Sequence, residues 1–364
     1  MFQNTFKNKR VLVTGHTGFK GSWLCSWLIK LGAQVAGYSD KVQTSPSLFN
    51  KLALSEKLHH DFRGDIRDYE TLKKSFEIFK PEIVIHLAAK ALVRDCYDNP
   101  GDAYSTNIMG TFNTLDLIAK SPDVKSAVMI TSDKCYENVE WEYGYREDDT
   151  LGGKDPYSAS KACAEILFSA QFRSYLKSKP ELQIATARAG NVIGGGDWAK
   201  DRIIPDCIRA WQKGETLNIR SPKATRPWQH VLEPLSGYLN LTSELYLRKP
   251  GLNGESFNFG PDADVNKTVE DMINEIKGIY PGAKVLMAEN NDPKEASLLK
   301  LSCDKALNRL QWGATLNFEQ TLDYTTSWYK TDEKQPDNLE AFTLKQIESY
   351  ETVAQKRGHL WAQS

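Results

Sequence analysis

The chain has 364 residues, with 46 basic side chains against 47 acidic ones, and six cysteines. The near balance of charge excludes a general polyanion-binding surface, and no basic run or zinc-finger pattern indicates a nucleic-acid partner. The apolar runs are too short to cross a membrane, and cysteines without a Cys-x-x-Cys pair predict reduced thiols, no metal site and a cytoplasmic location.

The first predicted elements are a short apolar strand at 10–13, a glycine-rich turn and a helix at 22–31. Gly15, Gly18 and Gly21 follow one another at intervals of three residues. Glycines at such a turn let the backbone approach a pyrophosphate, which then lies at the N-terminus of the helix. The order of strand, turn and helix therefore favours a dinucleotide site over an ordinary turn.

Acidic residues follow the next elements of this half. The predicted strand 34–38 ends near Asp40, where the carboxylate that holds an adenosine ribose is expected, although a solvated loop aspartate is the alternative. No arginine directly follows this strand end, although Lys41 does, and the absence of an arginine favours NAD over NADP. Asp65 opens the next helical segment, where it either reaches adenine or an aspartate simply caps the helix.

Two buried strands are predicted to end beside the cofactor. The first, at 82–89, ends in small residues that let the backbone pass close to a ligand. The second, at 126–130, delivers a hydroxyl, a carboxylate and an amine at its carboxyl end: Ser132, Asp133 and Lys134. Ligands bind at this edge of open parallel sheets, so the three residues are candidates for chemistry.

Tyr157 and Lys161 are four residues apart, which is about one helical turn, so they are predicted to lie on one face of a helix. There the ammonium of Lys161 is expected to lower the pKa of the Tyr157 phenol by stabilising the phenolate. Such a phenol is a good base for taking a proton from an alcohol while hydride leaves the same carbon. An ordinary surface pair is the alternative for an isolated match.

These segments resemble the extended short-chain dehydrogenase/reductase family and, within it, the subgroup of CDP-glucose 4,6-dehydratases. The resemblance spans roughly residues 8 to 320. It is carried by six runs of sequence: 15–23, 131–136, 144–147, 155–161, 188–198 and 226–232. The chain departs from the usual subgroup sequence at 88–94 and 293–297, which include Lys90 and Ser297 and are both expected near the substrate.

The resemblance implies an α/β fold, namely a Rossmann-type doubly wound parallel sheet with a smaller, mostly carboxyl-terminal lobe that binds substrate. It also implies NAD as the cofactor. The residues expected to hold NAD are Gly15, Thr17, Gly18, Phe19, Gly21, Asp40, Asp65, Ile66, Ala88, Ala89, Tyr157 and Lys161.

The activity implied is a lyase reaction that converts CDP-glucose, or a related nucleotide sugar, to a 4-keto-6-deoxy sugar for deoxysugar and O-antigen biosynthesis. Tyr157 takes the 4-hydroxyl proton, Lys161 holds the phenolate and the nicotinamide ribose, and Ser132 bonds near the 4-oxygen. Asp133 protonates the departing 6-hydroxyl. Lys134 is either the base at carbon 5 or a cation that stabilises the enolate.

The carboxyl half is expected to bind the nucleotide diphosphate. The candidate contacts are Arg94, Asn191, Arg202, Arg226 and His230. Arginines make charge-assisted bonds to phosphate, but a surface salt bridge is the alternative for Arg94 and a structural hydrogen bond for His230. Trp198 and Trp228 either stack on the base or pack.

The expected division is a NAD-binding domain at 1–190, with a returning segment near 230–262, and a substrate lobe at 191–229 and 263–364. Amphipathic patterns predict helices at 269–279 and 339–356, the latter being either a family-specific tail or an interface element. Apolar faces at 104–119 and 158–172 fit the helical interface of a homodimer or homotetramer, and equally fit packing on the sheet.

Two other activities share part of this residue pattern. A nucleotide-sugar 4-epimerase shares the cofactor, Tyr157 and Lys161, but epimerases generally carry a small residue at the position of Asp133. A non-catalytic NAD-binding scaffold is disfavoured because Tyr157 and Lys161 are both present.

Overall fold

The computed structural model describes residues 1–219, 222–262, 265, 267–280, 283–287 and 298–363. The segment 293–297, where the sequence departs from the subgroup at Ser297, lies outside the described residues. Within the described part of the chain, no helix is both long and apolar enough to cross a membrane.

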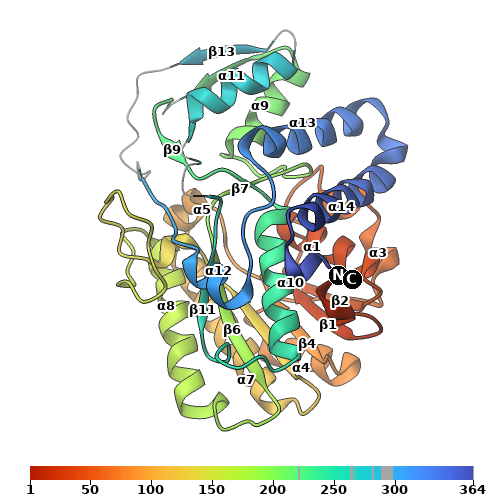
Figure 1. The fold of residues 1–364 in the computed structure, drawn as a ribbon, viewed down its shortest axis with the longest axis vertical. Coiled ribbons are helices and arrows are strands. Elements are labelled where there is room, and N and C mark those ends of the chain that lie inside the picture. The colour runs from red at the N-terminus through yellow and green to blue at the C-terminus, as the bar shows by residue number, and fades with distance from the viewer. Residues whose placement is uncertain (220–221, 263–264, 266, 281–282, 288–297, 364) are drawn as a thin grey trace.

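A seven-stranded parallel sheet organises the molecule (Figure 1). Its order is β3 (His60–Arg63), β2 (Gln34–Ser39), β1 (Arg10–Thr14), β4 (Ile83–His86), β5 (Ser126–Ile130), β6 (Gln183–Ala189) and β11 (Ser256–Phe259). All six pairings are parallel. The strand order reverses direction at β1, so the Rossmann-type doubly wound sheet predicted from the sequence is confirmed.

Alternate residues of the strands feed two apolar layers. In β1, Val11 and Val13 pack on the face that also holds Trp27, whereas Leu12 joins Leu72 on the other face. This alternation follows from the period of two residues in a strand. Helices α1 (Phe19–Lys30) and α10 (Leu232–Tyr246) cover the first face, and α4 (Tyr69–Phe79), α7 (Gly110–Lys120) and α8 (Pro156–Gln171) cover the second.

The other elements are short, or lie in the carboxyl half. They are η1 (Phe2–Asn4), α2 (Leu48–Lys51), α3 (Leu54–Lys57), α5 (Val93–Asp98), α6 (Pro100–Tyr104), η2 (Ser105–Met109), η3 (Asp133–Cys135), η4 (Phe172–Leu176), β7 (Val192–Ile193), α9 (Ile203–Gln212), β8 (Thr216–Ile219), β9 (Thr225–Arg226), β10 (Gln229–His230), β12 (Lys267–Thr268), α11 (Val269–Ile279), β13 (Lys284–Met287), α12 (Asp304–Leu310), α13 (Phe318–Lys334), η5 (Pro336–Asn338), α14 (Leu339–Lys356) and η6 (Leu360–Ala362).

The predicted helices at 269–279 and 339–356 are confirmed as α11 and α14. Figure 1 shows α9, α11, β13 and part of α13 as a layer beyond the carboxyl ends of the sheet strands. Other parts of the predicted substrate lobe lie elsewhere, since α12 contacts β11 and α14 contacts α1. The domain boundaries at 190, 230–262 and 263 stay a prediction.

The carboxyl-terminal tail packs on its own chain. Trp361 is 3% exposed and stacks on Phe2 with ring centroids 5.0 Å apart, which brings the two termini together (Figure 1). Glu351 of α14 accepts hydrogen bonds from Trp27 Nε1 and Lys30 Nζ, both at 2.8 Å. The tail therefore completes the apolar layer over α1.

The helical segment predicted at 104–119 is interrupted. It consists of α6, the π-helical turn η2 and α7, and Asn107 lies within the π-helical turn. Leu115 and Ile118 of α7 pack against the sheet, which confirms the sheet-packing alternative for this face. Met109 and Ile166, by contrast, are 50% and 56% exposed.

Candidate active site

The glycine-rich turn between β1 and α1 is too tightly packed for side chains. Gly15 has φ +74°, and a Cβ there would lie 2.8 Å from the backbone nitrogen of Ala88. A Cβ on Gly21 would lie 2.2 Å from the carbonyl oxygen of Gly15. Gly18 is the N-cap of α1 and leaves the first N–H groups of that helix without a capping side chain. Such a cradle fits a dinucleotide pyrophosphate.

The expected adenosine end is organised around Thr17 and Asp65. Thr17 Oγ1 lies 2.9 Å from Ser39 Oγ at the end of β2. Asp40 is exposed and accepts a hydrogen bond from Gln43, in line with the solvated-loop alternative. Ile66 is 6% exposed.

Asp65 does not cap the helix that follows it. Its carboxylate accepts hydrogen bonds from Arg67, including one from Nη2 at 2.6 Å, and this arginine lowers the pKa of Asp65. The N-cap of α4 is Asp68, which accepts from Thr71 N at 3.1 Å. Arg67 therefore holds the Asp65 carboxylate, and a contact of Asp65 with adenine stays a prediction.

The reaction end begins directly after β5. Ser132 Oγ donates to Asp133 Oδ1 at 3.0 Å, and both side chains are 5% exposed. Gly190, after β6, makes room for the carboxylate, because a Cβ there would lie 3.1 Å from Asp133 Oδ2. Burial raises the pKa of Asp133, with Lys134 as the main opposing charge. A carboxyl group with a raised pKa releases its proton less readily than a solvated aspartate, in the direction that a general acid requires.

Tyr157 and Lys161 lie on one face of α8, which begins after the N-cap Asp155. Tyr157 is 8% exposed and Lys161 is 6% exposed. The Lys161 ammonium donates to the carbonyl oxygen of Ile130 at 3.4 Å, and burial lowers its pKa to about 8. The pair is thus buried at the end of β5, which excludes the surface-pair alternative.

The expected depression of the Tyr157 pKa is wrong for this structure. Burial raises the pKa of the phenol, and the Asp133 carboxylate raises it further, against the opposing effects of Ser132 and Arg202. Removing the phenolate from water costs more than these neighbours return. Lys161 directs its ammonium to a backbone carbonyl instead.

Asn107 is a site residue that the sequence analysis missed. Its side-chain amide accepts from Lys90 N at 2.8 Å and donates to Lys90 O at 3.1 Å, and it also donates to Ser160 Oγ at 2.8 Å. It thereby ties the turn after β4 to the residue that precedes Lys161. The sequence offered no signal for it, because Asn107 lies among several other polar residues in this helical segment.

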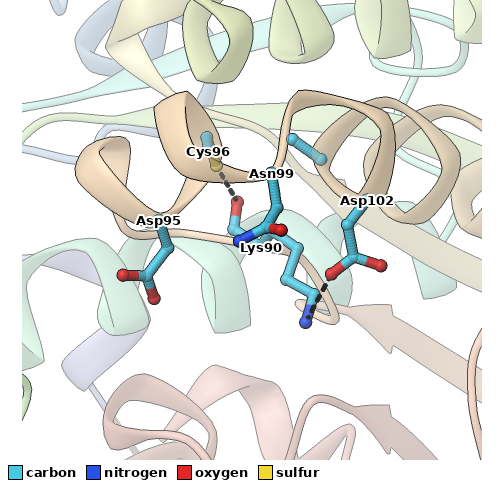
Figure 2. A pocket seen from close by; sticks show the side chains of 6 residues that line it. Lys90, Asp95, Cys96, Asn99 and Asp102 are labelled. Carbon is cyan, nitrogen blue, oxygen red and sulfur yellow. Dashed lines mark hydrogen bonds and ion pairs between the residues drawn. The ribbon is translucent and has the colours of Figure 1, made fainter.

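A small pocket adjoins this turn (Figure 2). Its lining residues are Lys90, Asp95, Cys96, Asn99, Asp102 and Ala103. Lys90 Nζ pairs with Asp102 Oδ2 at 2.9 Å, and Asp102 is also bound by Arg67, which links Lys90 to the adenine end. Cys96 and Ala103 pack against Tyr157, so the pocket lies next to this candidate catalytic residue.

The sequence analysis also missed a buried ion pair that joins β6 to α8. Arg188 Nη2 lies 2.8 Å from Glu165 Oε2, with side-chain exposures of 3% and 1%. Glu165, one turn after Lys161 on α8, also accepts hydrogen bonds from Thr131 and Thr186. Both Nη atoms of Arg188 donate hydrogen bonds, which offsets the cost of burying the charge, whereas its Nε has no hydrogen-bond partner among the described residues.

The three arginines predicted to contact the diphosphate have different partners in the structure. Arg202 is paired with Asp197 at 2.8 Å, and its positive charge lowers the pKa of Tyr157. Arg94 is paired with Asp201 at 3.0 Å on the surface. Arg226 donates to the carbonyl oxygen of Thr225.

The remaining candidates of this half are Asn191 and His230. Asn191 is half-buried after β6. His230 is fully buried and accepts from Leu232 N, and burial lowers its pKa to about 3, which fits the structural alternative. Trp198 and Trp228 are 7% and 5% exposed, which fits packing.

Among the described residues, no group of histidine, cysteine or carboxylate side chains could hold a metal ion. The six cysteines, predicted to be reduced, are free.

The chain matches a family model described as GDP-mannose 4,6 dehydratase over residues 12–325. It is 46% identical to the CDP-glucose 4,6-dehydratase of Salmonella typhimurium, over 90% of this chain and 92% of the relative. It is 26% identical to the dTDP-glucose 4,6-dehydratase of Haemophilus influenzae, over 88% of this chain and 97% of that protein.

Solved structures share the fold. The epimerase Mth375 from Methanothermobacter thermautotrophicus has a TM-score of 0.79 at 24% identity and covers 93% of this chain, with 96% of its own length matched. The dTDP-glucose 4,6-dehydratase from Bacillus anthracis, solved in complex with NAD, has a TM-score of 0.74 at 22% identity, covering 91% and 99% of the two chains. On the strength of the family model and of the relative from Salmonella, the chain belongs to the GDP-mannose 4,6 dehydratase family, within the extended short-chain dehydrogenases/reductases.

Proposed function

We propose that the protein is a nucleotide-sugar 4,6-dehydratase that converts CDP-glucose to CDP-4-keto-6-deoxyglucose with NAD. The observation that carries this proposal is the buried Asp133, whose raised pKa and contact with Ser132 provide an acid beside the base Tyr157. Oxidation at carbon 4 alone needs no such acid, whereas loss of the 6-hydroxyl does.

NAD supplies the acceptor for a hydride from carbon 4 of the sugar and the donor that returns it to carbon 6. The chain's residues that hold it are the glycines of the β1–α1 turn, Thr17 and Asp65 at the adenosine end, and Lys161 at the other end. The crowding at Gly15 and Gly21 supports this assignment, because side chains there would fill the cradle.

Tyr157 takes the proton of the 4-hydroxyl, and Ser132 binds the 4-oxygen. The resulting ketone acidifies the proton on carbon 5, which Lys134 removes, while Asp133 gives its proton to the departing 6-hydroxyl. Lys134 returns its proton to carbon 5 when carbon 6 is reduced, and so ends the cycle in its initial protonation state. After one turnover Tyr157 holds an extra proton and Asp133 lacks one. Ser132 bonds Asp133 and lowers the pKa of Tyr157, so its hydroxyl is placed to pass that proton back.

The choice of CDP-glucose rests on the relative from Salmonella, which is 46% identical. Arg202, Arg226, Arg94 and Asn191 are the proposed contacts to the nucleotide diphosphate. Release of Arg202 from Asp197, and of Arg94 from Asp201, is then part of substrate binding.

We also propose a homodimer formed through the helical face of α6, η2 and α8. Met109 and Ile166 expose large apolar side chains there, and Tyr104 is 38% exposed. Covering such side chains on a second copy is favourable. A tetramer and a cytoplasmic location remain further predictions.

The proposed function is tested by incubating purified protein with NAD and one glucose nucleotide at a time, with CDP, UDP, GDP and dTDP as the nucleotide. We expect product from CDP-glucose, lighter than the substrate by one water by mass spectrometry. If only another glucose nucleotide gives product, the dehydratase activity stands and that nucleotide sugar replaces CDP-glucose as the proposed substrate. An epimer of unchanged mass would overturn the proposal.

A further inference from the structure

Lys20 is a lysine within the glycine-rich turn to which neither the motif nor the proposed mechanism gives a role. It lies in the first turn of α1, between the N-cap Gly18 and the crowded Gly21. Its side chain is half-buried, and its ammonium lies 6.0 Å from the centre of the Tyr238 ring on α10. The ammonium is therefore held over α10 and does not extend along the surface.

The charges around Lys20 are those of the reaction end. Asp133 after β5 favours its ammonium, whereas Arg202 before α9 and Lys161 on α8 oppose it, and burial together with these two cations lowers its pKa to about 8. The Tyr238 hydroxyl beneath it is buried, with no hydrogen-bond partner among the residues described. Asp133 also raises the pKa of the Tyr238 phenol, which places Tyr238 near the proposed catalytic acid.

The position of Lys20 shows which end of the expected cofactor it is nearer to. Tyr157 and Lys161 mark the reacting carbon, because the proton and the hydride leave the same atom. The carboxylate at the adenine end, Asp65, is influenced by Arg67 and Lys90 instead. Lys20 therefore lies nearer to the expected nicotinamide end of the site than to the expected adenine end.

We propose that Lys20 makes the bound cofactor a stronger oxidant, by destabilising the cationic nicotinamide of NAD+ relative to the neutral ring of NADH. This inference rests on the proposed function, which supplies the NAD site. The pyrophosphate is common to NAD+ and NADH, so any attraction that Lys20 exerts on it leaves the difference between the two forms unchanged.

The effect assists the first half of the cycle. A hydride leaves the C–H bond of carbon 4, the hydroxyl proton goes to Tyr157, the alcohol becomes a ketone and NAD+ is reduced. The same charge opposes the return of the hydride to carbon 6, which the preceding loss of water has made favourable by creating a conjugated double bond. Lys20 thus makes the first hydride transfer, which is the harder one, more favourable, and makes the easier second transfer less favourable.

The test compares the affinities of NAD+ and NADH, measured by calorimetry without any nucleotide sugar. The variants are Lys20→Met, Lys20→Gln and the charge-preserving Lys20→Arg, with Lys74→Met on the exposed side of α4 as the matched control. We expect the ratio of the NAD+ Kd to the NADH Kd to fall about tenfold in the Met and Gln variants, the order expected for two nearby charges in partly screened surroundings. The Arg variant and the control keep the wild-type ratio.

An unchanged ratio in both neutral variants would overturn the inference while leaving the proposed function in place. Equal weakening of both forms would also overturn it, since Lys20 would then be a contact to the common pyrophosphate. If the wild-type protein binds neither form, the NAD site itself fails and the inference fails with it.

Discussion

Tyr157 shows how the surroundings of one side chain set its chemistry. Its phenol is 8% exposed, and burial raises its pKa, although Lys161 lies one turn away on the same helix. A phenol with a raised pKa stays protonated, and nearby cations are needed to stabilise the phenolate that acts as the base. Lys161, Lys20 and Arg202 border the same site, and of these Arg202 lowers the pKa of Tyr157.

At this scale the acid and the base of the elimination can be separated. In Asp133→Asn the 6-hydroxyl loses its proton donor, so we expect dehydration to slow by roughly 100-fold or more. Oxidation at carbon 4 and exchange of the carbon 5 proton with deuterium oxide continue in this variant. The readouts are product mass and deuterium at carbon 5.

Lys134→Met is the matched variant, and we expect it to lose the exchange at carbon 5 together with dehydration. Exchange at the wild-type rate in Lys134→Met would show that Lys134 is the stabilising cation, and that another group removes the proton.

At the scale of elements, the carboxyl-terminal helix is joined to the sheet layer through one buried carboxyl group. Glu233 on α10 is 1% exposed and accepts hydrogen bonds from Thr315 N, Leu316 N and the Tyr350 hydroxyl of α14. Burial raises its pKa from 4.5 to about 7. The folded protein thus holds this proton to a higher pH than the unfolded chain does.

The pH dependence of stability follows from that difference. Between about pH 4.5 and 7 the folded state binds more protons at Glu233, so its contribution to stability is full below this window and is lost as the pH rises through it. The loss amounts to roughly 3 kcal/mol. In Glu233→Gln we expect the melting midpoint to fall less between pH 5 and 8 than in the wild type, and Glu348→Gln, exposed on α14, serves as the control. Parallel curves for all three proteins would contradict the assignment.

The packing of the tail gives a second prediction at this scale. Trp361 stacks on Phe2 and on Tyr350, so Trp361→Ala removes a buried ring from between the two termini. We expect a loss of about 3–5 kcal/mol of unfolding free energy, measured by denaturant titration. The neighbouring Leu360 is 60% exposed, and Leu360→Ala is expected to change stability by less than about 0.5 kcal/mol. Similar small losses in both variants would mean that the tail does not contribute to the core.

At the scale of the whole molecule, the fold could be predicted from local signals that agree with one another. The glycines at 15, 18 and 21 follow an apolar strand, and the strand at 126–130 delivers Ser132, Asp133 and Lys134 at its carboxyl end, where parallel sheets bind ligands. Tyr157 and Lys161 share a helical face because of their spacing alone. These features depend on short stretches of chain.

What the sequence did not give depends on contacts between distant segments. Asn107 joins the turn after β4 to α8, 53 residues further along the chain at Ser160, and no local pattern encodes that pairing. Lys20 has a neighbour, Tyr238, on a helix that the sequence analysis did not place beside it. The raised pKa of Tyr157 likewise follows from burial, which only the packed structure defines.

The proposed reaction is an internal hydride transfer coupled to loss of water. It is tested most directly by giving the protein CDP-glucose that carries deuterium at carbon 4, with unlabelled NAD, and locating the label in the product by NMR. We predict a product lighter by one water with deuterium at carbon 6. A product without deuterium at carbon 6, or an epimer that keeps its label at carbon 4, would contradict the account.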